Sequence, residues 1–139
     1  MSVECFLDTN VLVYAVSALQ EDSAKKSRAL ELVQTSDFGI SSQVLQEFYV
    51  TVTRKIQKPL APEIAVALLQ EFRLFPTAHT DYPLILSAIE HSLRFRISYW
   101  DGAIVAAAEA LEASVLYSED LSHDQQYGEI RVVNPFLEV

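Results

Sequence analysis

Short apolar runs alternate with longer amphipathic stretches along most of this 139-residue chain. We expect strands at the apolar runs, which are residues 3–7, 38–41, 74–76, 115–117 and 130–133. We expect helices at the amphipathic stretches, which are residues 11–18, 23–33, 42–55, 62–72, 81–93 and 100–111, with Asn10 at or near the first cap. Strands that alternate with helices predict an α/β fold: three α/β/α layers around a mostly parallel sheet of about five short strands.

Nothing in the sequence divides the chain into two parts. Half of the residues are hydrophobic, and the three Gly and five Pro residues are spread thinly, without a linker or an internal repeat. We therefore expect one domain over residues 1–139. The longest apolar stretches are far shorter than the roughly 20 residues that cross a bilayer, and Asp8 interrupts the first one too early for a signal peptide. These features predict a soluble, cytoplasmic protein with no membrane contact.

The charge balance is strongly acidic, with ten Lys and Arg residues against nineteen Asp and Glu residues and a net charge of −9. A surplus of this sign opposes broad electrostatic attachment to nucleic acid and favours a basic partner. Basic residues cluster locally at residues 25–28 and 54–58. For either cluster alone, a solvated helix face is the simpler interpretation.

Four carboxylates occupy positions that suit chemistry. Asp8 follows the first predicted strand and Asp120 follows the fourth, and ligands gather at the carboxyl ends of parallel strands. Asp101 opens an alanine-rich helix, and Glu47 interrupts an apolar run. A buried, ionised carboxylate needs a cation or hydrogen-bond donors nearby. Four converging carboxylates would supply the hard oxygen ligands that Mg²⁺ and Mn²⁺ prefer, and such ions promote phosphodiester hydrolysis.

Each acid also has a simpler structural interpretation. Residues 98–101 fit an S-x-x-D capping box, which would make Asp101 a helix-end residue. Asp8 could stabilise the following turn, Glu47 could lie on a solvent-exposed helix face, and Asp120 could be an ordinary loop residue. The prediction of a metal site therefore rests on the set. No other catalytic pattern competes with it, because the three His residues have no ligand spacing and no glycine-rich phosphate loop is present.

Four segments carry a family resemblance in both order and spacing. They are FLDTNVL at residues 6–12, Ser42 with VLQEF at residues 44–48, YWDGAI at residues 99–104 and LYSEDL at residues 116–121. With these segments the chain resembles the PIN-domain family, and most closely the VapC-type toxins of bacterial toxin–antitoxin pairs. The resemblance implies a PIN-like fold and assigns catalysis and metal binding to Asp8, Glu47, Asp101 and Asp120, with Asn10 and Ser118 as supporting polar residues. Glu119 beside Asp120 offers a second carboxylate at the last position.

The resemblance further implies a Mg²⁺- or Mn²⁺-dependent endoribonuclease that forms a homodimer and is inhibited by a small antitoxin. The basic tail of such an antitoxin would suit the net charge of −9.

Two other functions remain open from the sequence. Asp-x-Asn after an apolar strand also resembles the first motif of haloacid-dehalogenase-like phosphatases, in which Asp8 would be the nucleophile. Those enzymes use a downstream Lys, and no Lys follows Lys58 in this chain. The other alternative is a PIN-like binding module without catalysis, which the complete set of acids disfavours.

Overall fold

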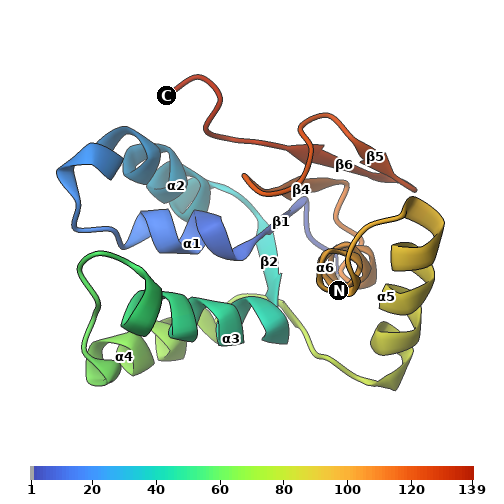
Figure 1. Ribbon diagram of the computed structural model, residues 1–139, viewed down its shortest axis with the longest axis horizontal. Helices are drawn as coiled ribbons and strands as arrows, with labels where there is room; N and C mark the ends of the chain where they lie inside the picture. Colours follow the sequence, from blue (N-terminus) through green and yellow to red (C-terminus); the bar gives the residue numbers. More distant parts are fainter. Residues whose placement is uncertain (1) are drawn as a thin grey trace.

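A six-stranded sheet runs through the centre of the protein (Figure 1). The computed structural model describes residues 2–139. The strands are β1 (Cys5–Leu7), β2 (Phe38–Ser41), β3 (Thr77–Ala78), β4 (Val115–Tyr117), β5 (Gln126–Tyr127) and β6 (Ile130–Val133). Their order across the sheet is β3-β2-β1-β4-β6-β5, and neighbouring strands are parallel except for β5 with β6.

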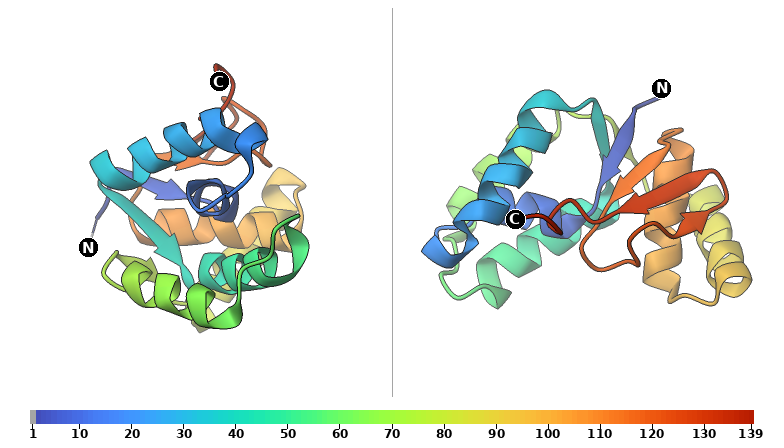
Figure 2. Two further views of the ribbon diagram at one scale, coloured as in Figure 1. Left: turned by 90° about the vertical axis from the view of Figure 1, so that its left-hand side faces the viewer. Right: turned by 90° about the horizontal axis from the view of Figure 1, so that it is seen from above.

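Helices cover both faces of this sheet. They are α1 (Thr9–Ala15), α2 (Ser23–Thr35), α3 (Ser42–Val50), α4 (Pro62–Phe72), α5 (Tyr82–Phe95) and α6 (Tyr99–Ala110). The right-hand view of Figure 2 places α5 and α6 on one side of the strands and α1 to α4 on the other. The predicted three-layer α/β/α fold with a mostly parallel sheet is therefore confirmed.

The strand predictions need two corrections. The third strand was expected at residues 74–76 but lies at Thr77–Ala78, paired with Ile40 and Ser41. Pro76 has no N–H to donate, so it contributes only its carbonyl, which accepts from the Ile40 amide at 3.0 Å. The structure has one strand more than the five predicted. This strand, β5, was missed because two residues are too few to show an alternating pattern.

The helix predictions differ from the structure mainly at the ends. Asp8 is the N-cap of α1, and Asn10 is the second residue of the helix rather than its cap. The helix predicted at residues 42–55 is α-helical only to Val50, and its last turn, Thr51–Lys55, is π-helical.

The buried apolar side chains form one cluster between the sheet and its helices. Central strand residues such as Phe6, Leu7, Ile40, Leu116 and Val132 have no exposed surface. Helix α6 is buried continuously from Gly102 to Ala108, as its alanine-rich sequence indicates. Among residues 2–139, no helix has both the length and the apolar character needed to cross a membrane.

Gly102 allows α6 to approach α5 closely. A Cβ atom at this position would lie 2.5 Å from the Ala88 carbonyl oxygen and 3.1 Å from the Ser92 backbone nitrogen. Both are backbone atoms of α5, so they cannot turn away as a flexible side chain would. The start of α6, where Asp101 lies, is therefore positioned by direct backbone packing between the two helices.

We predict that Gly102→Ala destabilises the fold by about 1–3 kcal/mol, the usual cost of forcing an extra carbon into a packed site. The added methyl group must push α5 away from α6, which outweighs the gain in helix propensity from alanine. Urea unfolding followed by circular dichroism measures the change. An unchanged unfolding midpoint would contradict the close packing of these two helices.

Candidate active site

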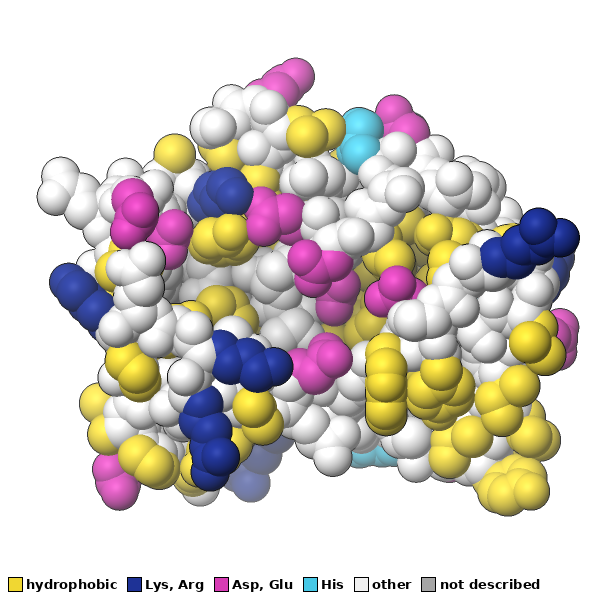
Figure 3. All heavy atoms as spheres, viewed as in Figure 1, with side chains coloured by type: hydrophobic (Ala, Val, Ile, Leu, Met, Phe, Trp, Pro, Cys, Tyr) yellow, Lys and Arg dark blue, Asp and Glu magenta, His cyan; other side chains and the backbone are white. Residues whose placement is uncertain are grey.

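A pocket of about 710 Å³ opens where β1 and β4 end. Asp8, Glu47, Asp101 and Asp120 all line it, and they come from four segments that are distant in the sequence. Figure 3 shows acidic side chains gathered around the hollow in the middle of this face. The structure thus brings the four predicted acids to one pocket.

Asp8 is the most buried of these acids, with 7% of its surface exposed. Its Oδ1 accepts from the Thr9 backbone N–H and its Oδ2 accepts from the Ser118 hydroxyl, both at 2.8 Å. The pKa of Asp8 is raised to about 6, mainly by burial and to a smaller extent by the charges of Asp120 and Glu47, although the two hydrogen bonds act in the opposite direction. Ionising Asp8 in the folded protein therefore costs free energy, and a nearby cation would reduce that cost.

Glu47 is held by donors from two helices. The Thr9 hydroxyl donates to its Oε1 at 2.8 Å, and the Gln43 side-chain amide lies 3.4 Å from its Oε2. The same Gln43 nitrogen donates to the Trp100 carbonyl oxygen at 3.2 Å. These contacts tie α1, α3 and the start of α6 together, and they direct Glu47 toward the pocket rather than toward an outer helix face.

Asp101 combines a capping position with a place in the pocket. Its backbone N–H donates to the hydroxyl of the N-cap residue Ser98 at 3.0 Å, as the capping interpretation expects. Its carboxylate lines the pocket and accepts no hydrogen bond from residues 2–139. The capping contact uses the main chain of Asp101, so its side chain remains available for a ligand.

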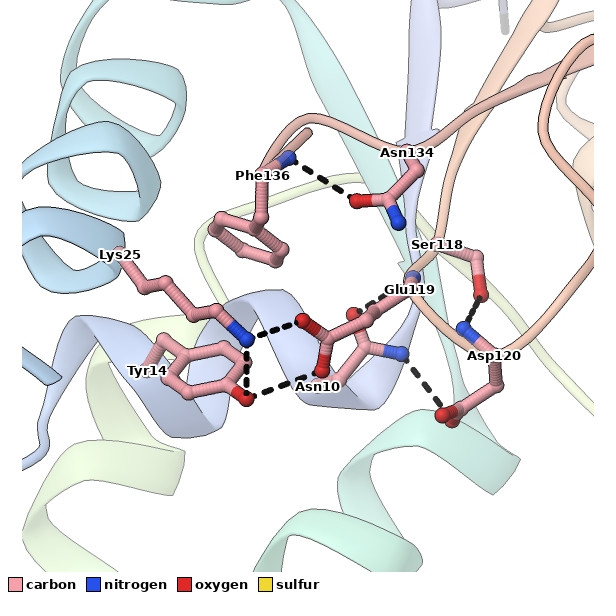
Figure 4. Close-up of polar contacts among 8 residues, drawn as sticks. All are labelled: Asn10, Tyr14, Lys25, Ser118, Glu119, Asp120, Asn134 and Phe136. Atoms are coloured by element: carbon pink, nitrogen blue, oxygen red, sulfur yellow. Dashed lines mark hydrogen bonds and ion pairs between the residues drawn. The ribbon is translucent and has the colours of Figure 1, made fainter. Parts of the chain in front are cut away.

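Glu119 and Asp120 have different partners, as Figure 4 shows. The Glu119 carboxylate accepts from Lys25 at 2.5 Å and from the Tyr14 hydroxyl at 2.9 Å. The Asp120 carboxylate points the other way and accepts from the Asn10 side chain at 3.1 Å. This geometry favours Asp120 as the fourth acid, because Lys25 already neutralises Glu119.

Asn10 and Ser118 hold the loop that carries Asp120. Asn10 Oδ1 accepts from the Glu119 backbone N–H at 3.2 Å while its amide donates to Asp120. Ser118 Oγ accepts from the backbone N–H groups of Asp120 and Leu121 while donating to Asp8. Both residues therefore contact the acids that the family resemblance assigns them to support.

The donor set of the pocket suits a hard divalent ion in its chemistry. Six carboxylates line the pocket, since Asp22 and Glu119 join the four predicted acids, and Lys55 and Lys58 are the only basic residues that line it within residues 2–139. No three acidic, His or Cys side chains of that range lie close enough together to hold an ion by themselves. Mg²⁺ usually keeps several waters and takes only one or two carboxylates directly. The arrangement therefore fits an ion held partly through water, rather than an all-protein cage.

Two residues of the site were not predicted. Thr9 and Gln43 donate to opposite oxygens of Glu47. Gln43 stands four residues before Glu47 in α3, a spacing at which helical side chains meet, so the sequence held a signal for this pair. Thr9 lies in another helix, and its contact depends on how α1 packs against α3.

We predict that Asp8→Asn stabilises the metal-free protein at pH 7.5 by up to about 3 kcal/mol, the equivalent of a pKa rise from 3.8 to about 6. The native state binds more protons than the unfolded state between these values, so wild-type stability falls as pH rises through pH 4–6 and stays low above it. Denaturant unfolding in chelator measures the difference. Asp81→Asn is the matched control, because Asp81 is also an N-cap carboxylate but is exposed. Equal pH profiles for wild type and Asp8→Asn would contradict the burial argument.

Comparison with known proteins agrees with this geometry. The sequence matches the PIN domain over residues 5–128, and no curated protein sequence matches it. VapC20 of Mycobacterium tuberculosis, described as a sarcin-ricin loop cleaving toxin, superimposes with a TM-score of 0.67 at 20% identity, covering 91% of this chain and 98% of that one. A toxin–antitoxin complex from Klebsiella pneumoniae superimposes with a TM-score of 0.69 at 15% identity, covering 95% of this chain and 98% of that one. VapBC2 of Rickettsia felis, bound to a promoter DNA fragment, superimposes with a TM-score of 0.62 at 19% identity, covering 92% of this chain and 96% of that one. Because the domain match includes most of the sequence, this chain belongs to the PIN domain family.

Proposed function

We propose that this protein is a metal-dependent endoribonuclease of the VapC type, which hydrolyses RNA phosphodiester bonds as the toxin of a type II toxin–antitoxin pair. The observation that carries the proposal is one pocket in a PIN-family fold, where Asp8, Glu47, Asp101 and Asp120 meet from four distant segments. The structural relatives support the choice of RNA and of a toxin role, since one is described as a sarcin-ricin loop cleaving toxin and another as a toxin–antitoxin complex.

Asp8, Glu47, Asp101 and Asp120 are the residues that would hold Mg²⁺ or Mn²⁺. Such an ion supplies an acidified water molecule and neutralises charge on the phosphodiester during in-line displacement. The protein's own contribution is orientation. Ser118 and the Thr9 amide fix the Asp8 carboxylate, and Asn10 holds that of Asp120.

The acidic pocket also supports the proposed partner. A protein with a net charge of −9 and a carboxylate-lined cavity attracts a cationic segment, such as the basic tail of a small antitoxin. A homodimer and a cytoplasmic site of action complete the proposal. The homodimer comes from the family resemblance, and the cytoplasmic location comes from the sequence features described above.

A phosphatase mechanism has less support. Both oxygens of Asp8 accept hydrogen bonds, and the side chain is buried, so it is poorly placed to attack a phosphate as a nucleophile. PIN-family membership also favours the nuclease. A non-catalytic binding module shares the fold, and only an activity assay separates it from the enzyme.

We predict that the purified protein cleaves cellular RNA when Mn²⁺ or Mg²⁺ is present and stops when the ion is chelated. Asp8→Asn and Asp101→Asn should each lower the cleavage rate more than about 100-fold, because supporting residues of metal sites alone cost 10–100-fold. Gel analysis and sequencing of the cleaved ends measure the loss. Full cleavage in chelator would refute metal dependence. Absence of cleavage by folded wild type with added metal would favour the binding module.

We predict that Asp120→Asn lowers the cleavage rate about 10- to 100-fold, whereas Glu119→Gln lowers it only a few-fold. The two variants remove adjacent carboxylates of the same loop and serve as each other's matched control. Their side chains point to different partners (Figure 4), and Asp120, unlike Glu119, is among the charges that raise the pKa of Asp8. The reverse order of effects would assign the fourth position to Glu119.

A further inference from the structure

Trp100, the only Trp in the chain, is unusually exposed for so large an aromatic side chain. It retains 64% of its surface accessible although it is in the first turn of a buried helix, α6. Its position is nevertheless well defined. Its carbonyl oxygen accepts from the buried Gln43 side chain, and its ring packs edge-on against Tyr99 with the centroids 5.0 Å apart. The result is an exposed aromatic surface on a fixed backbone.

This aromatic surface belongs to the acidic pocket. Trp100 lines the pocket and directly precedes Asp101, and the Gln43 nitrogen that binds its carbonyl also lies 3.4 Å from Glu47. A ligand whose reacting group met the carboxylates would therefore have its neighbouring part within reach of the indole ring.

Two cations line the same pocket. Lys55 and Lys58 are exposed, and neither has an ion-pair partner within residues 2–139. They lie at the end of the π-helical turn after α3 and in the loop that follows. Figure 1 places this loop on the left and α6 right of centre. Figure 3 shows Lys and Arg side chains beside the acidic group on this face.

We infer that Trp100 is the surface on which a nucleobase of the RNA stacks, and that Lys55 and Lys58 hold its backbone phosphates. The inference rests on the proposed ribonuclease function and names the residues that bind the substrate beside the acids. An aromatic platform combined with a cationic edge is how proteins bind single-stranded nucleic acid, since bases inside a duplex have no free face to stack. The lysines also offset the repulsion between the carboxylates and the phosphates.

The direct test uses the intrinsic fluorescence of Trp100, which no other Trp obscures. In chelator, where cleavage stops, a mixed-sequence 12-nucleotide single-stranded RNA should quench this fluorescence, and the duplex of the same sequence should not. Fluorescence unchanged by saturating single-stranded RNA, with binding shown by anisotropy of a labelled strand, would overturn the inference.

Substitution gives a second test on the same labelled RNA. Trp100→Ala should weaken binding about 5- to 150-fold, the range known for base–aromatic stacking, and Trp100→Phe should recover part of the loss. In cleavage assays Trp100→Ala should raise KM, whereas kcat should stay within about threefold of the wild-type value. Tyr82→Ala is the matched control, because Tyr82 is 75% exposed and lies outside the pocket. Unchanged RNA affinity in Trp100→Ala, or a dissociated dimer in light scattering with RNA affinity intact, would overturn the inference in favour of a protein interface.

Salt dependence tests the lysines. For a single strand, the slope of log affinity against log salt concentration is negative, and each lost phosphate contact reduces its magnitude by about 0.7. Lys55→Gln and Lys58→Gln should each cause this reduction. Arg54→Gln is the matched control, because Arg54 is the exposed neighbour of Lys55 but does not line the pocket. Equal slopes for all three variants would overturn the lysine part. Because these are binding measurements, they can fail while metal-dependent cleavage remains intact, which separates this inference from the proposed function.

Discussion

The hydrogen bond between Ser118 and Asp8 is the contact on which the acidic pocket depends. Leu7 and Tyr117 are register partners at the ends of the parallel strands β1 and β4, so the next residues, Asp8 and Ser118, lie side by side although 110 positions separate them. Asp8 can be both buried and ionisable only because this hydroxyl and the Thr9 amide face its two oxygens. The sheet therefore buries a carboxylate whose ionisation costs free energy, and the other acids of the pocket lie around it.

The last acid is oriented by contacts that spread outward from the same serine. Ser118 accepts two backbone N–H groups of its own loop, and Asn10 clamps that loop from α1. Lys25 and Tyr14 donate to the Glu119 carboxylate and hold it away from Asp120. Lys25 also lies 4.8 Å from the centre of the Tyr14 ring. Both Glu119 and Asp120 line the pocket, but Glu119 is paired with Lys25 and Tyr14, whereas Asp120 turns toward Asn10 (Figure 4).

The sequence alone could place those residues of the candidate site that follow the ends of strands. Asp8 and the loop holding Asp120 follow neighbouring parallel strands, so the topology brings them together once the α/β alternation is recognised. It could not choose between Glu119 and Asp120, because that choice depends on Lys25, 94 residues away in the sequence. It also missed β5, where two residues carry no readable pattern, and the Thr9 contact that needs α1 packed on α3.

The same carboxylates link stability, cofactor and partner. With Asp8 buried and Glu47 and Asp120 close enough to raise its pKa, the pocket concentrates negative charge that opposes folding at neutral pH. Any cation that binds only the folded pocket stabilises the protein by mass action, whether it is a divalent ion or a Lys or Arg side chain of a partner. The two would compete, since both seek the same oxygens. A basic inhibitory segment would thus gain affinity by relieving the repulsion between the carboxylates, the same repulsion that makes the pocket suitable for an ion.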